Sequence, residues 1–417
     1  LHLSIRRQRQ MCIRDSAIPV ALVALSVATG GVLEFPVGDE TVGVNTTQSA
    51  ALLVALLAVR RVVRRQVLRL DLVALPVAVL LAYTVVQGLG AGVGPFGTGG
   101  FGRFATVLLL LLALPQFEVG PPARVPSFPR WDVPVVLMGV VIAIMALVKV
   151  VPAMGDPGLG FYDLKDVVQL PLGNHNYVAA ILVASLAVVL VRPLGRTWWS
   201  VAAGVIGLGL VVTLSRGGWL AAGVVLVVLA ATRRDRATVR TVAGVGLVAL
   251  ALLVVVVLAG GGATGRLAGV FSPATQARMD LWGASWDAFM ANPLVGVGID
   301  RLPEWMTAVR QPYVHAHNLV LHALATTGVV GTAVYLTYWT MAAGRVVRLP
   351  ERDQRLRVGL PLLALFVHAQ IDSLSHFLVY EVVVATLVGV AAAHAAAPYV
   401  RELGPGARRL GGAGPSQ

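Results

Sequence analysis

The feature that most constrains this chain is a series of long apolar runs separated by short arginine-rich segments. A helix needs roughly 20 apolar residues to cross a bilayer, and about twelve such runs can be placed along the chain. Only 13% of the residues are charged, whereas soluble domains carry about 25%. The sequence therefore predicts an all-α integral membrane protein with about twelve transmembrane helices.

The positions of these runs give the expected spans. One run, 198–232, is too long for a single helix and is interrupted at 215–218, so we expect it to form two helices. The other expected helices are about 17–35, 48–63, 72–89, 101–117, 133–151, 174–191, 241–259, 315–343, 358–371 and 377–396.

The arginines indicate the orientation of the spans. The formal net charge is +13, which in a soluble protein would favour nucleic-acid binding, but here the basic residues cluster between apolar runs. Such clusters mark cytoplasmic turns, and placing 60–69 inside puts every other arginine-rich turn inside as well. This topology predicts cytoplasmic termini and a large outer loop, about 260–314, between the ninth and tenth helices. We expect no nucleic-acid partner.

The ends of the chain differ from its centre in composition. Residues 1–16 have no apolar core, so they do not form a signal peptide, and we interpret them as an artefact or a basic cytoplasmic tail. Residues 17–400 are expected to form one polytopic domain, and 401–417 a cytoplasmic tail. Cys12 is the single cysteine, which excludes a disulfide framework and a cysteine zinc site.

Polar side chains collect at the outer ends of the expected spans. Ionisable groups at membrane depth are costly and are candidates for function. The set comprises Asp156, Tyr162, Asp163, Lys165, Asp166, Asn174, His175, Asn176, Arg216, Arg266, Arg278, Arg301, Arg310, His315, His317, Asn318, Asp372 and His376.

Arg216 interrupts a long apolar run and is followed by two glycines. A guanidinium beside a helix N-terminus forms an anion site by charge and by dipole. The alternative is an arginine that extends to lipid headgroups. We favour the anion site, because an arginine that only extends to lipid headgroups would not need the glycine pair.

The outer loop contains a segment with helical spacing of aromatic residues. Trp282, Trp286 and Phe289 follow one another at intervals of four and three residues, which predicts an amphipathic helix able to lie at the membrane interface. Arg278 lies one turn before Trp282, near the same stripe. A packing helix with a solvated arginine is an equally weighted alternative.

Two histidines, His315 and His317, precede an apolar helix. Residues two apart do not face each other on a helix, and no third ligand lies at zinc-like spacing, so we expect neither a metal nor a cofactor. A histidine at a helix start suits proton acceptance near neutral pH. Asn174 and Asn176 begin another span, where capping and substrate binding remain equally open.

Several segments together resemble the O-antigen ligase and polymerase superfamily of bacterial membrane glycosyltransferases. His317-Asn318, nine residues, then Gly328 matches the family's H-N-x9-G pattern, and LSRGGWLA around Arg216 is similar to its arginine-bearing helix start. Asn174 and Asn176 lie in a segment like its G-N-x-N motif. The long segment from Arg278 resembles R-x3-W followed by P-x-x-G-x-G, through Arg278, Trp282, Pro293, Gly296 and Gly298.

The resemblance implies transfer of a glycan from an undecaprenyl-diphosphate donor to an acceptor hydroxyl at the outer face of the bacterial inner membrane. It also implies inversion at the anomeric carbon and no metal. In this interpretation His317 is the general base, Arg216 and Arg278 bind the diphosphate, and Asn174, Asn176, Asn318, His315 and Trp282 contact substrate.

The sequence leaves the exact reaction open. An O-antigen ligase, a capsule or exopolysaccharide polymerase and a protein O-oligosaccharyltransferase all fit these segments, and the acceptor is then a glycan or lipid-linked glycan. The rival from another class is a secondary transporter of a small anion, since broken helices with polar ends also suit transport. A transporter predicts polar groups at mid-membrane depth and related halves, and the sequence shows neither.

Overall fold

The computed structural model describes residues 18–29, 32–37, 40–65, 67–92, 94, 99–117, 131–156, 159, 161–192, 197–233, 244, 274–306, 315–372, 374, 377–394 and 400–402. The expected span 241–259 lies outside the described residues except for residue 244, as do 1–16 and most of the C-terminal tail. Of the expected loop 260–314, the described part is 274–306.

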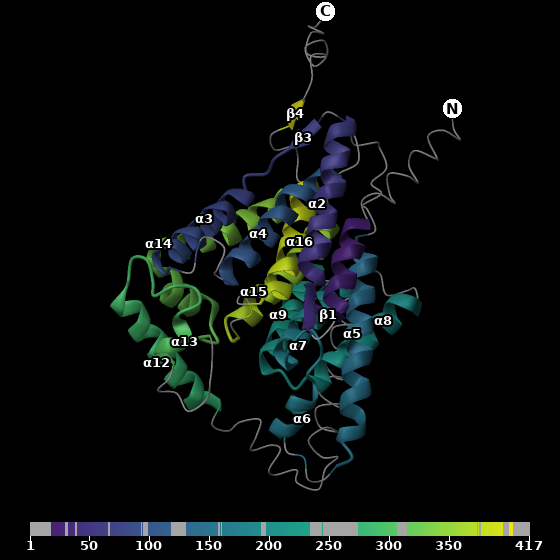
Figure 1. Cartoon of the computed structure of the whole chain (residues 1–417). Helices are drawn as coiled ribbons and strands as arrows, with labels where there is room; N and C mark the ends of the chain where they lie inside the picture. The colour runs from purple at the N-terminus through teal and green to yellow at the C-terminus, as the bar shows by residue number, and fades with distance from the viewer. Residues whose placement is uncertain are drawn as a thin grey trace, which may run out of the picture.

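The described chain is almost entirely helical (Figure 1). A helix at Ile18–Ala28 precedes the labelled elements. The first half of the chain then contains β1 (Val32–Val37), β2 (Glu40–Asn45), α2 (Thr46–Arg65), β3 (Val67–Arg69), α3 (Ala74–Gly90), α4 (Gly99–Ala113), η1 (Leu114–Phe117), α5 (Asp132–Ala153), α6 (Phe161–Val167) and α7 (His175–Leu190). The second half contains α8 (Thr197–Val212), α9 (Arg216–Arg233), α12 (Ala274–Ala291), α13 (Leu302–Trp305), α14 (Leu319–Val347), α15 (Arg352–Ala369), α16 (Leu378–His394) and β4 (Val400–Glu402).

Two helices form the centre of the bundle. Every residue of α7 from Tyr177 to Leu190 is buried, and so is every residue of α16 from Tyr380 to Ala393. A helix that is apolar on all sides belongs inside a large core or a membrane. The other helices surround these two, with α15 and α9 packing on α7, and α4 on α16.

The outside of the bundle is apolar as well. Leu56 and Val59 on α2 and Val141 and Val148 on α5 are exposed, and five helices of the described chain are long and apolar enough to cross a membrane. Five further apolar helices are shorter. Because lipid tails replace water around such a surface, the fold is that of an all-α membrane protein.

The first expected span is shorter than its apolar run. The helix ends at Ala28, and β1 and β2 then form an antiparallel hairpin in which Val32 pairs with Asn45. The sequence of this stretch explains the difference: Gly30 and Gly31 disfavour helix continuation, and Pro36 lacks the N–H that a helix interior requires. The expected helix end at residue 35 was therefore wrong.

Ion pairs join the helices at the end of the bundle where the arginine-rich turns lie. Each pair links a residue near the C-terminus of one helix with a residue near the N-terminus of another, which is consistent with antiparallel neighbours. These pairs are Arg192–Asp132, Arg233–Asp353 and Arg345–Asp71. The starts of α7, α9, α14 and α16 and the end of α15 consequently meet at the opposite end.

A break in α14 attaches the outer-loop helices to the bundle. Gly328 adopts φ 62° and ψ −169°, which interrupts the hydrogen bonds of α14. The N–H groups of Val329 and Val330 donate instead to Pro293 and Leu294, while the N–H groups of Val297 and Gly298 donate to carbonyls of α14. The turn at 293–298 thus satisfies the backbone groups that the break exposes, and holds α12 and α13 beside the bundle (Figure 1).

Candidate anion and proton-transfer site

Ser215 begins the helix that carries Arg216. Leu214 has φ 53°, a left-handed conformation that ends α8 and turns the chain. The Oγ of Ser215 then accepts from the N–H of Gly218 at 3.2 Å, as an N-cap does, and donates to Oδ1 of Asn176 at 2.8 Å. The Ser215 cap and Asn176 together fix the start of α9, so Arg216 projects from a defined helix N-terminus.

The glycine pair after Arg216 permits close packing. A Cβ at Gly217 would lie 2.7 Å from Cδ2 of His368 and 3.0 Å from Oδ2 of Asp372, and a Cβ at Gly218 would lie 2.8 Å from Ala179. The glycines do not interrupt α9, which is continuous from Arg216. The glycines instead let His368 and Asp372 approach the helix start.

His317 and Asn318 stand at the start of α14. Asn318 uses both ends of its amide: Oδ1 accepts from the N–H of Leu321 at 2.9 Å, and Nδ2 donates to the carbonyl of Gln370 at 2.9 Å. His317 has φ 51°, a conformation that is uncommon for residues other than glycine. Asn318 therefore ties this corner to the end of α15 and helps to hold the unusual backbone of His317.

Asp372 lies at the centre of the candidate site. It is 2% exposed, and its Oδ1 accepts from Nδ1 of His317 at 2.9 Å and lies 3.6 Å from a guanidinium nitrogen of Arg278. Nε2 of His368 is 3.5 Å from Oδ2. Burial alone would raise the pKa of Asp372, but the hydrogen bonds from His317 and His368 outweigh it and hold the pKa well below its usual range.

The structure therefore brings together three of the proposed functional positions. His317 and Arg278 meet at Asp372, and Arg216 adjoins Gly217, which packs on His368 and Asp372. Sequence reasoning placed Asp372 among the polar outer residues but gave it no role. A signal was present, since Asp372 directly follows an apolar helix and ionisable groups at such positions are costly.

The other residues expected to contact substrate have varied surroundings. Asn174 caps α7, accepting from the N–H of Asn176 at 3.0 Å, and Asn176 supports Ser215. The His315 ring is 4.4 Å from that of His317 and is buried. Trp282 is 40% exposed on α12, so its indole faces outward from the packed face of that helix.

The buried face of α12 differs from the expected aromatic stripe. Leu281, Ser285 and Ala288 are buried against the neighbouring elements, whereas Trp282 and Trp286 are 40% and 51% exposed. Exposed indoles on a helix beside a membrane bundle suit the bilayer interface. The expected helix is therefore present, but it is hardly amphipathic, because its largest aromatic residues lie outside its buried face.

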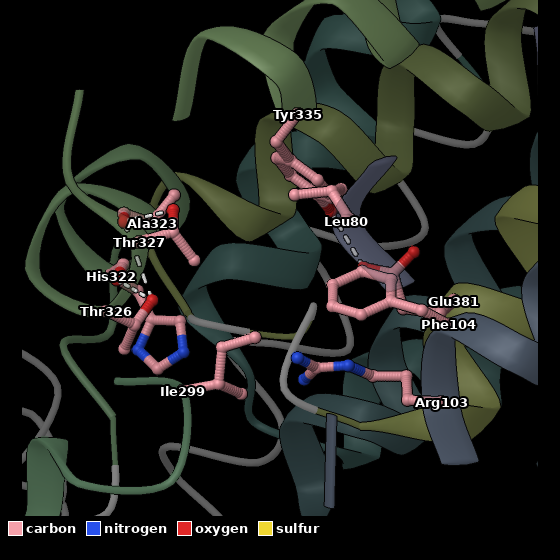
Figure 2. A pocket seen from close by; sticks show the side chains of 10 residues that line it. All are labelled: Leu80, Arg103, Phe104, Ile299, His322, Ala323, Thr326, Thr327, Tyr335 and Glu381. Carbon is pink, nitrogen blue, oxygen red and sulfur yellow. Dashed lines mark hydrogen bonds between the residues drawn. The ribbon is translucent and has the colours of Figure 1, made fainter. Parts of the chain in front are cut away.

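A second cluster of polar side chains lies on another side of α14. His322 lines a small cavity together with Thr326 and, from the facing helices, Arg103 and Glu381 (Figure 2). Oη of Tyr335 donates to Oε1 of the buried Glu381 at 2.7 Å. His322 itself is buried among these residues.

The donor set around Asp372 suits anions and protons. Arginine nitrogens and helix N–H groups bind phosphate-like anions, and an imidazole held by a carboxylate suits proton acceptance. Within the described ranges no group of three or more His, Cys, Asp or Glu side chains has an arrangement that could hold a metal ion.

Fold and site together define a helical membrane protein with a basic, histidine-bearing site where several helix starts meet. Residues 201–336 match the O-antigen ligase family model, Wzy_C, a segment that contains Arg216, Arg278, His317 and Gly328. This match supports the resemblance to the O-antigen ligase and polymerase superfamily that the motifs indicate. Among curated proteins none matches the chain.

Proposed function

We propose that this protein transfers a glycan from an undecaprenyl-diphosphate donor to an acceptor hydroxyl at the outer face of the bacterial inner membrane. The acceptor oxygen bonds to the anomeric carbon, and the bond between that carbon and the diphosphate oxygen breaks with inversion. The acceptor proton passes to the enzyme, and undecaprenyl diphosphate leaves. The family match supports a ligase or polymerase with lipid-linked glycan substrates.

The contact between His317 and Asp372 carries the proposal. Nδ1 of His317 donates to Oδ1 of Asp372 at 2.9 Å, which selects the tautomer in which Nε2 is the basic nitrogen. Nε2 then accepts the acceptor's proton, and the anionic carboxylate stabilises the imidazolium that forms. Base catalysis of this kind contributes on the order of 10²–10⁴-fold in rate.

The two arginines act on the leaving group in this mechanism. Arg216 stands at the N-terminus of α9, and Arg278 is brought toward the same place by its ion pair with Asp372. Guanidinium groups bind phosphate oxygens bidentately, and the helix dipole of α9 adds to the attraction. Together they stabilise the charge that develops on the departing lipid diphosphate without a metal ion.

Ligases and polymerases differ in the acceptor, and this chain suits a polymerase of capsule or exopolysaccharide repeats or a general ligase. None of its motifs is specific to a lipid A core acceptor. The partners are accordingly the lipid-linked donor, a glycan or lipid-linked glycan acceptor, and the surrounding lipid.

The test uses purified full-length protein, an undecaprenyl-diphosphate-linked oligosaccharide and EDTA. We expect transfer by the wild type and a loss of about 100-fold or more for His317→Ala and Arg216→Ala. His394→Ala and Arg352→Ala, which lie away from the site, serve as matched controls and should retain activity. Transfer by His317→Ala and Arg216→Ala at the wild-type rate would refute the mechanism.

The same preparation distinguishes the rival function. A secondary transporter of a small anion predicts accumulation of a solute in proteoliposomes, with no glycan transfer by any variant. That result would replace the proposal, since transport needs neither an acceptor hydroxyl nor a general base.

A further inference from the structure

Lys165 is a buried lysine on α6 beside the candidate site. It is 7% exposed, and it is one of two lysines in a chain whose other basic residues are arginines. Leu164 is buried against Leu214, which precedes the cap of α9, and Trp219 packs on the same small cluster. This packing places α6, and Lys165 with it, beside the start of the helix that carries Arg216.

Both basic and acidic groups surround Lys165. Its ammonium interacts electrostatically with Arg216 on α9, Asp372 after α15 and Arg278 on α12. Asp166 on the same helix acts on it as well, and Lys165 in turn acts on His175 on α7. Burial, followed by the charge of Arg216, lowers the pKa of Lys165 to about 8. At pH 7 the amine is therefore still charged, although burial disfavours the charged form. A bound anion would offset this unfavourable free energy.

We propose that Lys165 is the third cation of the diphosphate site, where it binds the donor's phosphate oxygens together with Arg216 and Arg278. This inference rests on the proposed function for its ligand class. The charges of Lys165, Arg216 and Arg278 exceed those of Asp372 and Asp166 by roughly one positive charge, so the site as a whole attracts a negatively charged diphosphate diester. With the arginines alone, Asp372 would cancel half of their charge.

The inference predicts a specific pH dependence. Diphosphate binding needs the ammonium form, which predominates below pH 8 and declines above it. Affinity for the donor should therefore be constant below about pH 7 and fall several-fold between pH 7 and 9. An arginine at this position stays charged over the whole range, so Lys165→Arg should remove that fall.

The experiment measures binding of undecaprenyl diphosphate to purified full-length protein at pH 7 and pH 9, alongside the donor KM and kcat. At pH 7, Lys165→Met should raise Kd and KM about 10-fold or more with a smaller change in kcat, and Lys165→Arg should stay near the wild type. Lys149→Met is the matched control, because Lys149 is exposed and donates to the carbonyl of Gln169.

The possible outcomes separate the role of Lys165 from the proposed glycan-transfer reaction. Wild-type Kd and KM in Lys165→Met, with an unchanged pH profile, would overturn the role of Lys165 while leaving glycan transfer intact. Lys165-dependent binding of undecaprenyl diphosphate without glycan transfer would support the anion site and refute the proposed reaction. Unchanged binding in Lys165→Arg would show that the effect of Lys165→Met reflects lost charge, since a misfolded variant would not be rescued by arginine.

Discussion

At the scale of single residues, the unusual feature is a buried aspartate that contacts both a histidine and an arginine. Oδ1 of Asp372 is 2.9 Å from Nδ1 of His317 and 3.6 Å from Arg278. A carboxylate in this position sets the tautomer of the imidazole and stabilises its protonated form. Removing its charge should therefore affect catalysis more strongly than it affects folding.

We predict that Asp372→Asn lowers kcat for glycan transfer by about 100-fold or more, because the amide cannot impose the required tautomer or stabilise the imidazolium. The donor KM should change less than kcat does. Asp353→Asn is the matched control, since Asp353 pairs with Arg233 away from the site. An equal loss in both variants would show that the effect comes from general destabilisation.

The sequence indicated which residues are functional candidates better than it indicated which residues they contact. His317, Arg278 and Arg216 stood out because charged or titratable groups beside apolar runs are costly. The sequence could not show that Asp372, more than fifty positions after His317, completes the contact. Nor could spacing show that Asn174 caps α7 while Asn176 holds Ser215, because both positions suit capping.

At the scale of elements, two glycine motifs prove to be two sides of one contact. A Cβ at Gly328 would lie 2.3 Å from backbone atoms of Leu294, and one at Gly296 would lie 2.4 Å from the backbone of Thr326. Both glycines have positive φ, which other residues rarely adopt. The family motifs around His317 and Pro293 are thus physically joined through the break in α14.

We predict that Gly328→Ala destabilises the protein by about 2–4 kcal/mol, because it adds backbone strain and a clash with Leu294. The thermal midpoint in detergent should fall by about 5 °C or more. Gly344→Ala lies on the same helix, where a Cβ meets nothing within 4 Å, and should be neutral or slightly stabilising. Equal midpoints for the two variants would contradict a structural role for the break.

At the scale of the whole molecule, hydropathy predicted the class and most helix positions. The split of the run 198–232 agrees with α8 and α9, which end and begin on either side of Ser215. Boundaries were less predictable, because apolar residues also occur in the hairpin β1–β2. The short helix α6 was missed, since seven residues within a polar connection give no periodic signal.

The orientation of the chain in the membrane is the remaining whole-molecule prediction. The positive-inside rule places the arginine-rich turns in the cytoplasm, which puts α6, α12 and the candidate site outside. After Cys12→Ser, single cysteines can be introduced at exposed positions on each side: Asp163 and Asp287 on α6 and α12, and Arg64 and Arg352 at the arginine-rich turns.

We expect a membrane-impermeant maleimide to label Asp163→Cys and Asp287→Cys in intact cells, and Arg64→Cys and Arg352→Cys only after the membrane is opened. The reason is that roughly 30 Å of hydrocarbon separates the two sets and excludes a charged reagent. Because undecaprenyl-diphosphate-linked glycans would be used on the outer face, the reverse pattern would place His317 and Asp372 in the cytoplasm. That pattern would exclude the proposed reaction whatever the activity of the isolated protein.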